Sequence, residues 1–124
     1  MLDSHPLLWW LADDRRLGER SRELIAAAES DVAVSAASVW ELGIKNALGK
    51  LTIPPDLMTQ LAGNGIRAID VTVAHGLHAA RLPPVHGDPF DRMLVAQAQL
   101  EGRSLVTRDA QIARYDVHVL PAGA

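Results

Sequence analysis

The sequence contains no cysteine, has few aromatic side chains and lacks any long apolar run. Without cysteine the chain cannot form disulfides or thiolate metal sites, and this composition favours a reducing, cytoplasmic location. No apolar stretch approaches the ~18 residues that a membrane-spanning helix needs, so we expect no membrane association. The N-terminal segment has no basic run followed by an apolar core, so we expect no signal peptide.

An excess of basic charge is also missing, since 12 lysines and arginines face 15 aspartates and glutamates, for a net charge of −3. Modules that only bind nucleic acid usually carry a basic surface, because phosphate contacts supply much of their affinity. The acidic balance argues against such a module. It remains compatible with an enzyme that uses its carboxylates to hold a metal ion. The length of 124 residues predicts one domain over residues 1–124.

Short apolar, β-branched segments alternate with helical patterns along the chain. We expect strands at 1–3, 31–35, 66–71, 104–107 and 117–120, and helices at 18–28, 38–48, 56–63, 72–82, 88–101 and 110–115. This alternation predicts an α/β fold, in which a parallel sheet is covered by helices on both faces. In such sheets functional groups collect at the carboxyl ends of the strands.

Four carboxylates occupy such positions. Asp3 and Asp109 directly follow expected strands, while Glu41 and Asp91 lie in the first turns of expected helices. Carboxylates gathered in one pocket repel each other unless a cation neutralises them. Hard oxygen ligands suit Mg²⁺ or Mn²⁺, and such an ion activates water for attack on a phosphodiester. The four acids therefore predict a metal-dependent hydrolase acting on nucleic acid.

Each acid taken alone also has a purely structural explanation. Ser38-x-x-Glu41 has the pattern of a capping box, and Asp91 is placed where an acid favours the helix dipole. Asp109 could cap the helix that follows it, and Asp3 could be a turn residue. The catalytic interpretation depends on all four acids together.

Four segments carry a resemblance to a known family: Leu2-Asp-Ser-His5, Val34-Ser-Ala-Ala-Ser-Val-Trp-Glu41, Asp88-Pro-Phe-Asp-Arg-Met-Leu-Val-Ala-Gln97 and Leu105-Val-Thr-Arg-Asp109. In order and spacing they resemble the PIN-domain nucleases, and more narrowly the VapC-like toxins of type II toxin–antitoxin pairs. The resemblance implies a Rossmann-like, three-layer fold with a central parallel sheet of about five strands. It also implies Mg²⁺- or Mn²⁺-dependent endoribonuclease activity, a homodimer, and a small antitoxin protein that blocks the site.

The family's acidic quartet falls on Asp3, Glu41, Asp91 and Asp109. We expect Asp3 and Asp91 to be the main direct metal ligands. The other two acids would bind through water, hold a second ion or orient the attacking water. The family usually has more apolar residues before its first aspartate, whereas only two residues precede Asp3 here, so we expect a short first strand.

Other residues beside the acids have expected supporting roles. Ser4 and Thr107 would donate hydrogen bonds that fix a carboxylate. Arg92 and Arg108 adjoin two of the acids and could contact phosphate, or they could be surface arginines that pair with the acids. We also expect Trp40, beside Glu41, to pack and hold its helix.

Competing interpretations remain open at this point. His75, His78, His86 and Asp88 could form a zinc site, although their spacing supports it weakly and His86 could instead line the rim of the acidic site. The chain could be a degenerate PIN module that binds RNA or protein without cutting. It could also be a phosphatase-like or DNA-cutting enzyme that uses the same metal chemistry.

Overall fold

A computed structural model describes residues 1–124. Its helices are α1 (Ser4–Leu11), α2 (Glu19–Ala26), α3 (Ala36–Ala47), α4 (Leu57–Gly63), α5 (Val73–Ala80) and α6 (Pro89–Glu101), with a 3-10 turn, η1 (Ile112–Arg114). Its strands are β1 (Ala33–Ser35), β2 (Arg67–Ile69), β3 (Leu105–Thr107) and β4 (Val119–Pro121). None of the helices has the length and apolar character needed to cross a bilayer.

The strands form two parallel pairs, β1 with β2 and β3 with β4. Leu2 lies between the pairs and makes isolated parallel bridges to Val34 and Val106. The sequence predicted about five strands, whereas the structure contains four, and the expected first strand is a single bridged residue. Only Leu2 of this segment makes bridges, so no continuous ladder joins the two pairs of strands.

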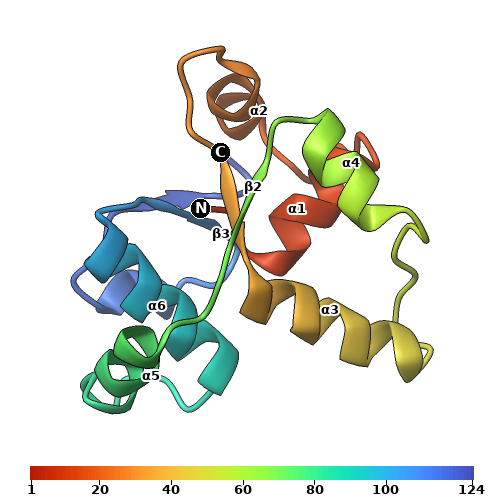
Figure 1. The fold of residues 1–124 in the computed structure, drawn as a ribbon. Helices are drawn as coiled ribbons and strands as arrows, with labels where there is room; N and C mark the ends of the chain where they lie inside the picture. The colour runs from red at the N-terminus through yellow and green to blue at the C-terminus, as the bar shows by residue number, and fades with distance from the viewer.

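Helices cover both faces of this layer (Figure 1), as the alternating pattern predicted. Leu2, Val34 and Val106 belong to a buried cluster that includes side chains of α1, α2 and α4. Met1 and Leu105 belong to a second cluster, with side chains of α5 and α6. Successive side chains of an extended segment point to opposite faces, so β3 contributes Val106 to the first cluster and Leu105 to the second, and β4 contributes Leu120 and Val119 in the same way.

Local signals explain the two helices that matter most for the site. Asp88 caps α6, where its Oδ1 accepts hydrogen bonds from the backbone N–H groups of Phe90 at 2.8 Å and Asp91 at 3.3 Å. Pro89 occupies the first turn and Gly102 ends the helix with a left-handed φ of 64°. The expected boundaries of this helix are confirmed.

The beginning of α3 differs from the prediction. The helix starts at Ala36, and its N-cap is Ser35, whose side chain accepts a hydrogen bond from the backbone N–H of Ala37 at 3.0 Å. The alternative explanation of Glu41 as part of a capping box with Ser38 is therefore wrong, and the buried Ser38 hydroxyl has no partner. Glu41 lies in the second turn of α3, which leaves its carboxylate free for another role.

Candidate functional site

The carboxyl edge of the strand layer brings the four predicted acids together. A cavity of about 150 Å³ opens there, and no hydrophobic residue lines it. Its lining residues are Asp3, His5, Glu41, Lys45, Asp88, Asp91, Arg108 and Asp109. Each member of the quartet comes from a different segment: the end of the Leu2 bridge, α3, α6 and the turn after β3.

Asp3 is the most firmly held of the acids and is only 7% exposed. Its Oδ1 accepts a hydrogen bond from the backbone N–H of Ser4 at 2.7 Å, and its Oδ2 accepts one from Thr107 Oγ1 at 2.8 Å. The Ser4 hydroxyl also donates to Glu41, which joins α1 to α3 across the site. Ser4 and Thr107 thus make the carboxylate contacts expected of them.

Thr107 connects two acids of the quartet. While its hydroxyl donates to Asp3, the same oxygen accepts a hydrogen bond from the backbone N–H of Asp109 at 3.0 Å. Asp109 is further held by the Gln111 backbone N–H, which donates to its Oδ1 at 2.9 Å. The strand end therefore fixes the distance between the first and the last acid of the sequence.

Asp91 carries the strongest electrostatic perturbation in the site. Asp91 is only 8% exposed, and this burial raises the pKa of its carboxyl to about 7. The negative charges of Asp3, Asp88 and Asp109 contribute to the same increase. Burial also acts to raise the pKa of Asp109. Hydrogen bonds from Gln111 and His86 outweigh that effect and leave the Asp109 pKa lowered.

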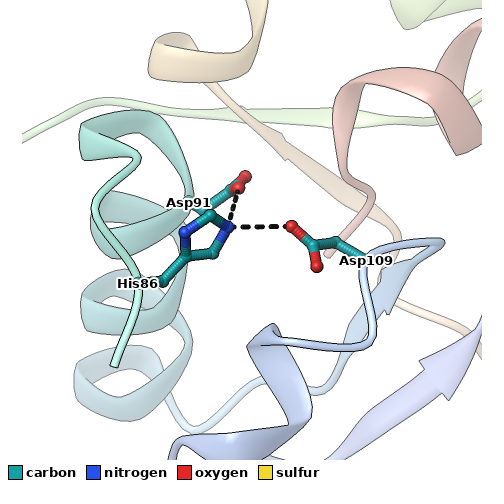
Figure 2. A group of neighbouring side chains, drawn as sticks. All are labelled: His86, Asp91 and Asp109. Atoms are coloured by element: carbon teal, nitrogen blue, oxygen red, sulfur yellow. Dashed lines mark hydrogen bonds and ion pairs between the residues drawn. The ribbon is translucent and has the colours of Figure 1, made fainter. Parts of the chain in front are cut away.

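His86 lies between Asp91 and Asp109 (Figure 2). Its Nε2 is 3.0 Å from Asp91 Oδ2 and 2.9 Å from Asp109 Oδ2. The hydrogen bond to Asp109 is the main cause of a raised His86 pKa, and the charges of the neighbouring carboxylates act in the same direction. The sequence suggested only that His86 could line the rim of the acidic site. Nothing in the local sequence pattern indicates that His86 and Asp109 are in contact.

The proposed zinc cluster does not assemble. His75 Nε2 pairs with Glu101 Oε1 at 2.8 Å, and His78 Nε2 contacts Gln99 Oε1 at 2.6 Å, so both rings are used between α5 and α6. The side chains that lie close enough together to hold a metal ion are instead His86, Asp91 and Asp109.

The two arginines have different surroundings. Arg108 lines the acidic cavity, contacts His5 Nε2 at 3.1 Å and makes no ion pair. Arg92 does not line the cavity. Its guanidinium donates to the backbone carbonyls of Ala79, Leu82 and Pro83 at 2.9 to 3.0 Å.

Sequence reasoning missed two basic residues of the site. Lys45 Nζ lies 3.9 Å from Glu41 Oε2, and His5 lines the cavity two residues after Asp3. The spacing of Glu41 and Lys45, four residues apart on one helix, was the available signal for the first. Trp40 is also placed differently from its prediction, since it is 66% exposed and stacks edge-on against Phe90 at 5.3 Å.

Known proteins share this arrangement of segments. The PIN-domain family model matches residues 1–118. Ribonuclease VapC22 of Mycobacterium tuberculosis (strain ATCC 25618 / H37Rv) is 33% identical over 115 residues, which cover 90% of this chain and 88% of the relative. A chain in a solved toxin–antitoxin complex from Klebsiella pneumoniae has the same fold, with a TM-score of 0.67 and 17% identity over 98% of this chain and 95% of that chain. From the family match and the VapC relative together, we conclude that this chain is a VapC-like member of the PIN-domain family.

Proposed function

We propose that the protein is a metal-dependent endoribonuclease and the toxin of a toxin–antitoxin pair. The observation that carries the proposal is the convergence of Asp3, Glu41, Asp91 and Asp109 on one small polar cavity. Such a constellation costs folding free energy through like-charge repulsion, and it is retained where a cation or a reaction uses it. The similarity to a protein named ribonuclease VapC22 supports RNA as the substrate.

The donor set fits a hard divalent ion. The cavity holds several carboxylates and no thiolate, and the pKa of Asp91 is raised first by burial and then by the negative charges of its neighbouring aspartates. Asp3 and Asp91 would be the main direct ligands for Mg²⁺ or Mn²⁺, with Glu41 and Asp109 completing the site. A bound ion would supply an activated water and stabilise the charge that develops on the phosphoryl oxygens.

The remaining residues of the chain position these ligands and the substrate. Ser4 and Thr107 hold Asp3 in one orientation, which pre-organises the site before any ion binds. Arg108 would contact a phosphate of the RNA, since it lines the cavity and its guanidinium contacts His5 rather than an acid. Arg92 would act indirectly, through the backbone segment that it holds. We place this activity in the cytoplasm, where the RNA would be met.

The partners of the proposed function are a small antitoxin and a second copy of the chain. Similarity to a chain of a toxin–antitoxin complex supports the first. An apolar groove between α3 and α6 supports the second copy of the chain. It is formed mainly by Trp40, Ile44, Phe90 and Met93. Light scattering should show a dimer that Trp40→Ser weakens, whereas Met58→Ser, which changes an 86% exposed residue on α4, should leave it intact.

The proposed activity is tested by mapping cleavage in total RNA with purified protein, with Mn²⁺, with Mg²⁺ and with chelator. Discrete internal cuts that need a metal and disappear in Asp91→Asn would support it. A single-stranded DNA of matched sequence tests whether the chain instead cuts DNA. RNA binding without cleavage under any metal condition would favour the degenerate, non-catalytic module.

A further inference from the structure

The His86 ring has a place in the site that the carboxylate chemistry alone does not explain. It comes from the loop between α5 and α6, and its Nε2 is directed at Asp91 and Asp109 (Figure 2). Those two carboxylate oxygens lie 3.0 and 2.9 Å from Nε2, and all three atoms lie within 4.8 Å of one another. These three atoms are therefore close enough together to contact one ion.

The loop that carries His86 lies near the surface and is held in place by hydrogen bonds to Tyr115 and Arg92. The His86 backbone N–H donates to the Tyr115 hydroxyl at 2.9 Å, and Arg92 Nη1 contacts both that hydroxyl at 3.3 Å and the His86 carbonyl at 3.5 Å. On the ring itself, Nδ1 lies 3.4 Å from the backbone nitrogen of Asp88. The position of Nε2 is thus fixed by α6, by the backbone before it and by the turn after β3, as a pre-organised ligand requires.

We propose that His86 is a direct metal ligand together with Asp91 and Asp109, and that it makes the site prefer Mn²⁺ over Mg²⁺. The inference rests on the proposed metal-dependent function and specifies its ion. An imidazole nitrogen suits first-row transition ions, whereas Mg²⁺ takes oxygen ligands almost exclusively. In this structure Nε2 contacts both carboxylates, so the ring and the two acids already face one another.

The competing explanation is that His86 only serves as a counter-charge for the two aspartates. In that case an incoming ion would have to displace the ring, and removing the ring would strengthen metal binding. The two explanations therefore predict changes of opposite sign in Mn²⁺ affinity, and they differ in whether nitrogen is bound to the ion.

The experiment measures Mn²⁺ binding without any substrate. Titration calorimetry gives Mn²⁺ and Mg²⁺ affinities for the full chain and for His86→Ala, His86→Gln and the control His118→Ala, which changes an exposed histidine bonded to Ser104. Pulsed electron paramagnetic resonance of the Mn²⁺ complex reports whether an imidazole nitrogen is coordinated. Thermal melts in chelator establish that each variant is folded.

We expect an imidazole nitrogen signal in the unmodified chain and in His118→Ala, and its loss in both His86 variants. Mn²⁺ affinity should fall roughly tenfold or more in His86→Ala, with a smaller change for Mg²⁺. Mn²⁺ binding with no nitrogen signal, or with affinity unchanged or increased in a folded His86 variant, would overturn the inference and leave the proposed nuclease standing. Failure of the unmodified chain to bind Mn²⁺ at all would overturn both.

Discussion

At the residue scale, Asp91 shows how the site balances stability against chemistry. Its pKa of about 7 lies well above the 3.8 of an ordinary aspartate, because burial and three neighbouring aspartates disfavour its charge. Between pH 3.8 and about 7, the folded state therefore keeps a proton on Asp91 that the unfolded state has released. Stability consequently falls as the pH rises through this interval.

Asp91→Asn should remove the loss of stability that the charged Asp91 carboxylate causes at high pH. In chelator at pH 8 we expect a free energy of unfolding unchanged or higher by on the order of 1 kcal/mol, since solvent access screens part of the repulsion. Urea unfolding at pH 8 and at pH 5 measures the difference, which should shrink at the lower pH. A clear loss of stability at pH 8 would mean that Asp91 acts mainly as a favourable helix-end charge.

Thr107 is the residue whose hydroxyl couples Asp3 to Asp109. Thr107→Val keeps the shape of this buried side chain but leaves an Asp3 oxygen and the Asp109 N–H without their partner. We expect a loss of about 1–3 kcal/mol in the free energy of unfolding and weaker Mn²⁺ binding. Thr107→Ser retains the hydroxyl and is the matched control; equal effects of the two changes would assign the role of Thr107 to packing instead.

At the element scale, α6 delivers Asp91 through its first turn, and Asp88 holds that turn by its cap. Asp88→Ala should cost about 0.5–2 kcal/mol of stability, because two backbone N–H groups lose their acceptor. It should also lower Mn²⁺ affinity by disordering the turn that carries Asp91. Asp88→Asn keeps the cap, so its stability in chelator should stay near that of the unmodified chain; calorimetry and urea unfolding check both variants.

The helices also show where local sequence suffices and where it does not. For α6, the capping Asp88, the first-turn Pro89 and the terminal Gly102 can each be recognised from the sequence alone, and the predicted boundaries are confirmed. For α3, Ser35 and Ser38 are both acceptable caps by local pattern. The end of β1 at Ser35 decides between them, since the chain leaves the sheet there and the first free N–H groups follow directly.

At the scale of the whole molecule, His86 and Asp91 act in one direction near neutral pH, whereas the lowered pKa of the partly buried His5 acts in the opposite one. His86 has a raised pKa through its bond to Asp109, so the stability it contributes below pH 6.5 is lost as the pH rises through its folded pKa. Asp91 acts in the same sense, whereas the lowered pKa of Asp109 affects only the acid range below 3.8.

Metal binding should stabilise the protein more at higher pH. The increase in melting temperature that Mn²⁺ produces should be larger at pH 8 than at pH 6, because the ligands must lose protons to bind the ion. In chelator, the carboxyl of Asp91 and the buried amino group of Met1, whose pKa burial lowers to about 6, act in opposite directions between these pH values. Thermal melts at pH 6 and pH 8, each with and without Mn²⁺, give the four melting temperatures that this comparison needs. A Mn²⁺ effect that is absent, or that is greater at pH 6, would contradict a site built on Asp91.

The sequence by itself determined the α/β class and most helix boundaries, and it predicted the acidic quartet. These features depend on local periodicity, on caps and on residues next to strand ends. The tertiary structure decided that Leu2 forms only a bridge, that Arg92 binds backbone carbonyls, and that His86 lies between Asp91 and Asp109. Each of these depends on contacts between segments far apart in the chain, and local sequence patterns carry no information about such distances.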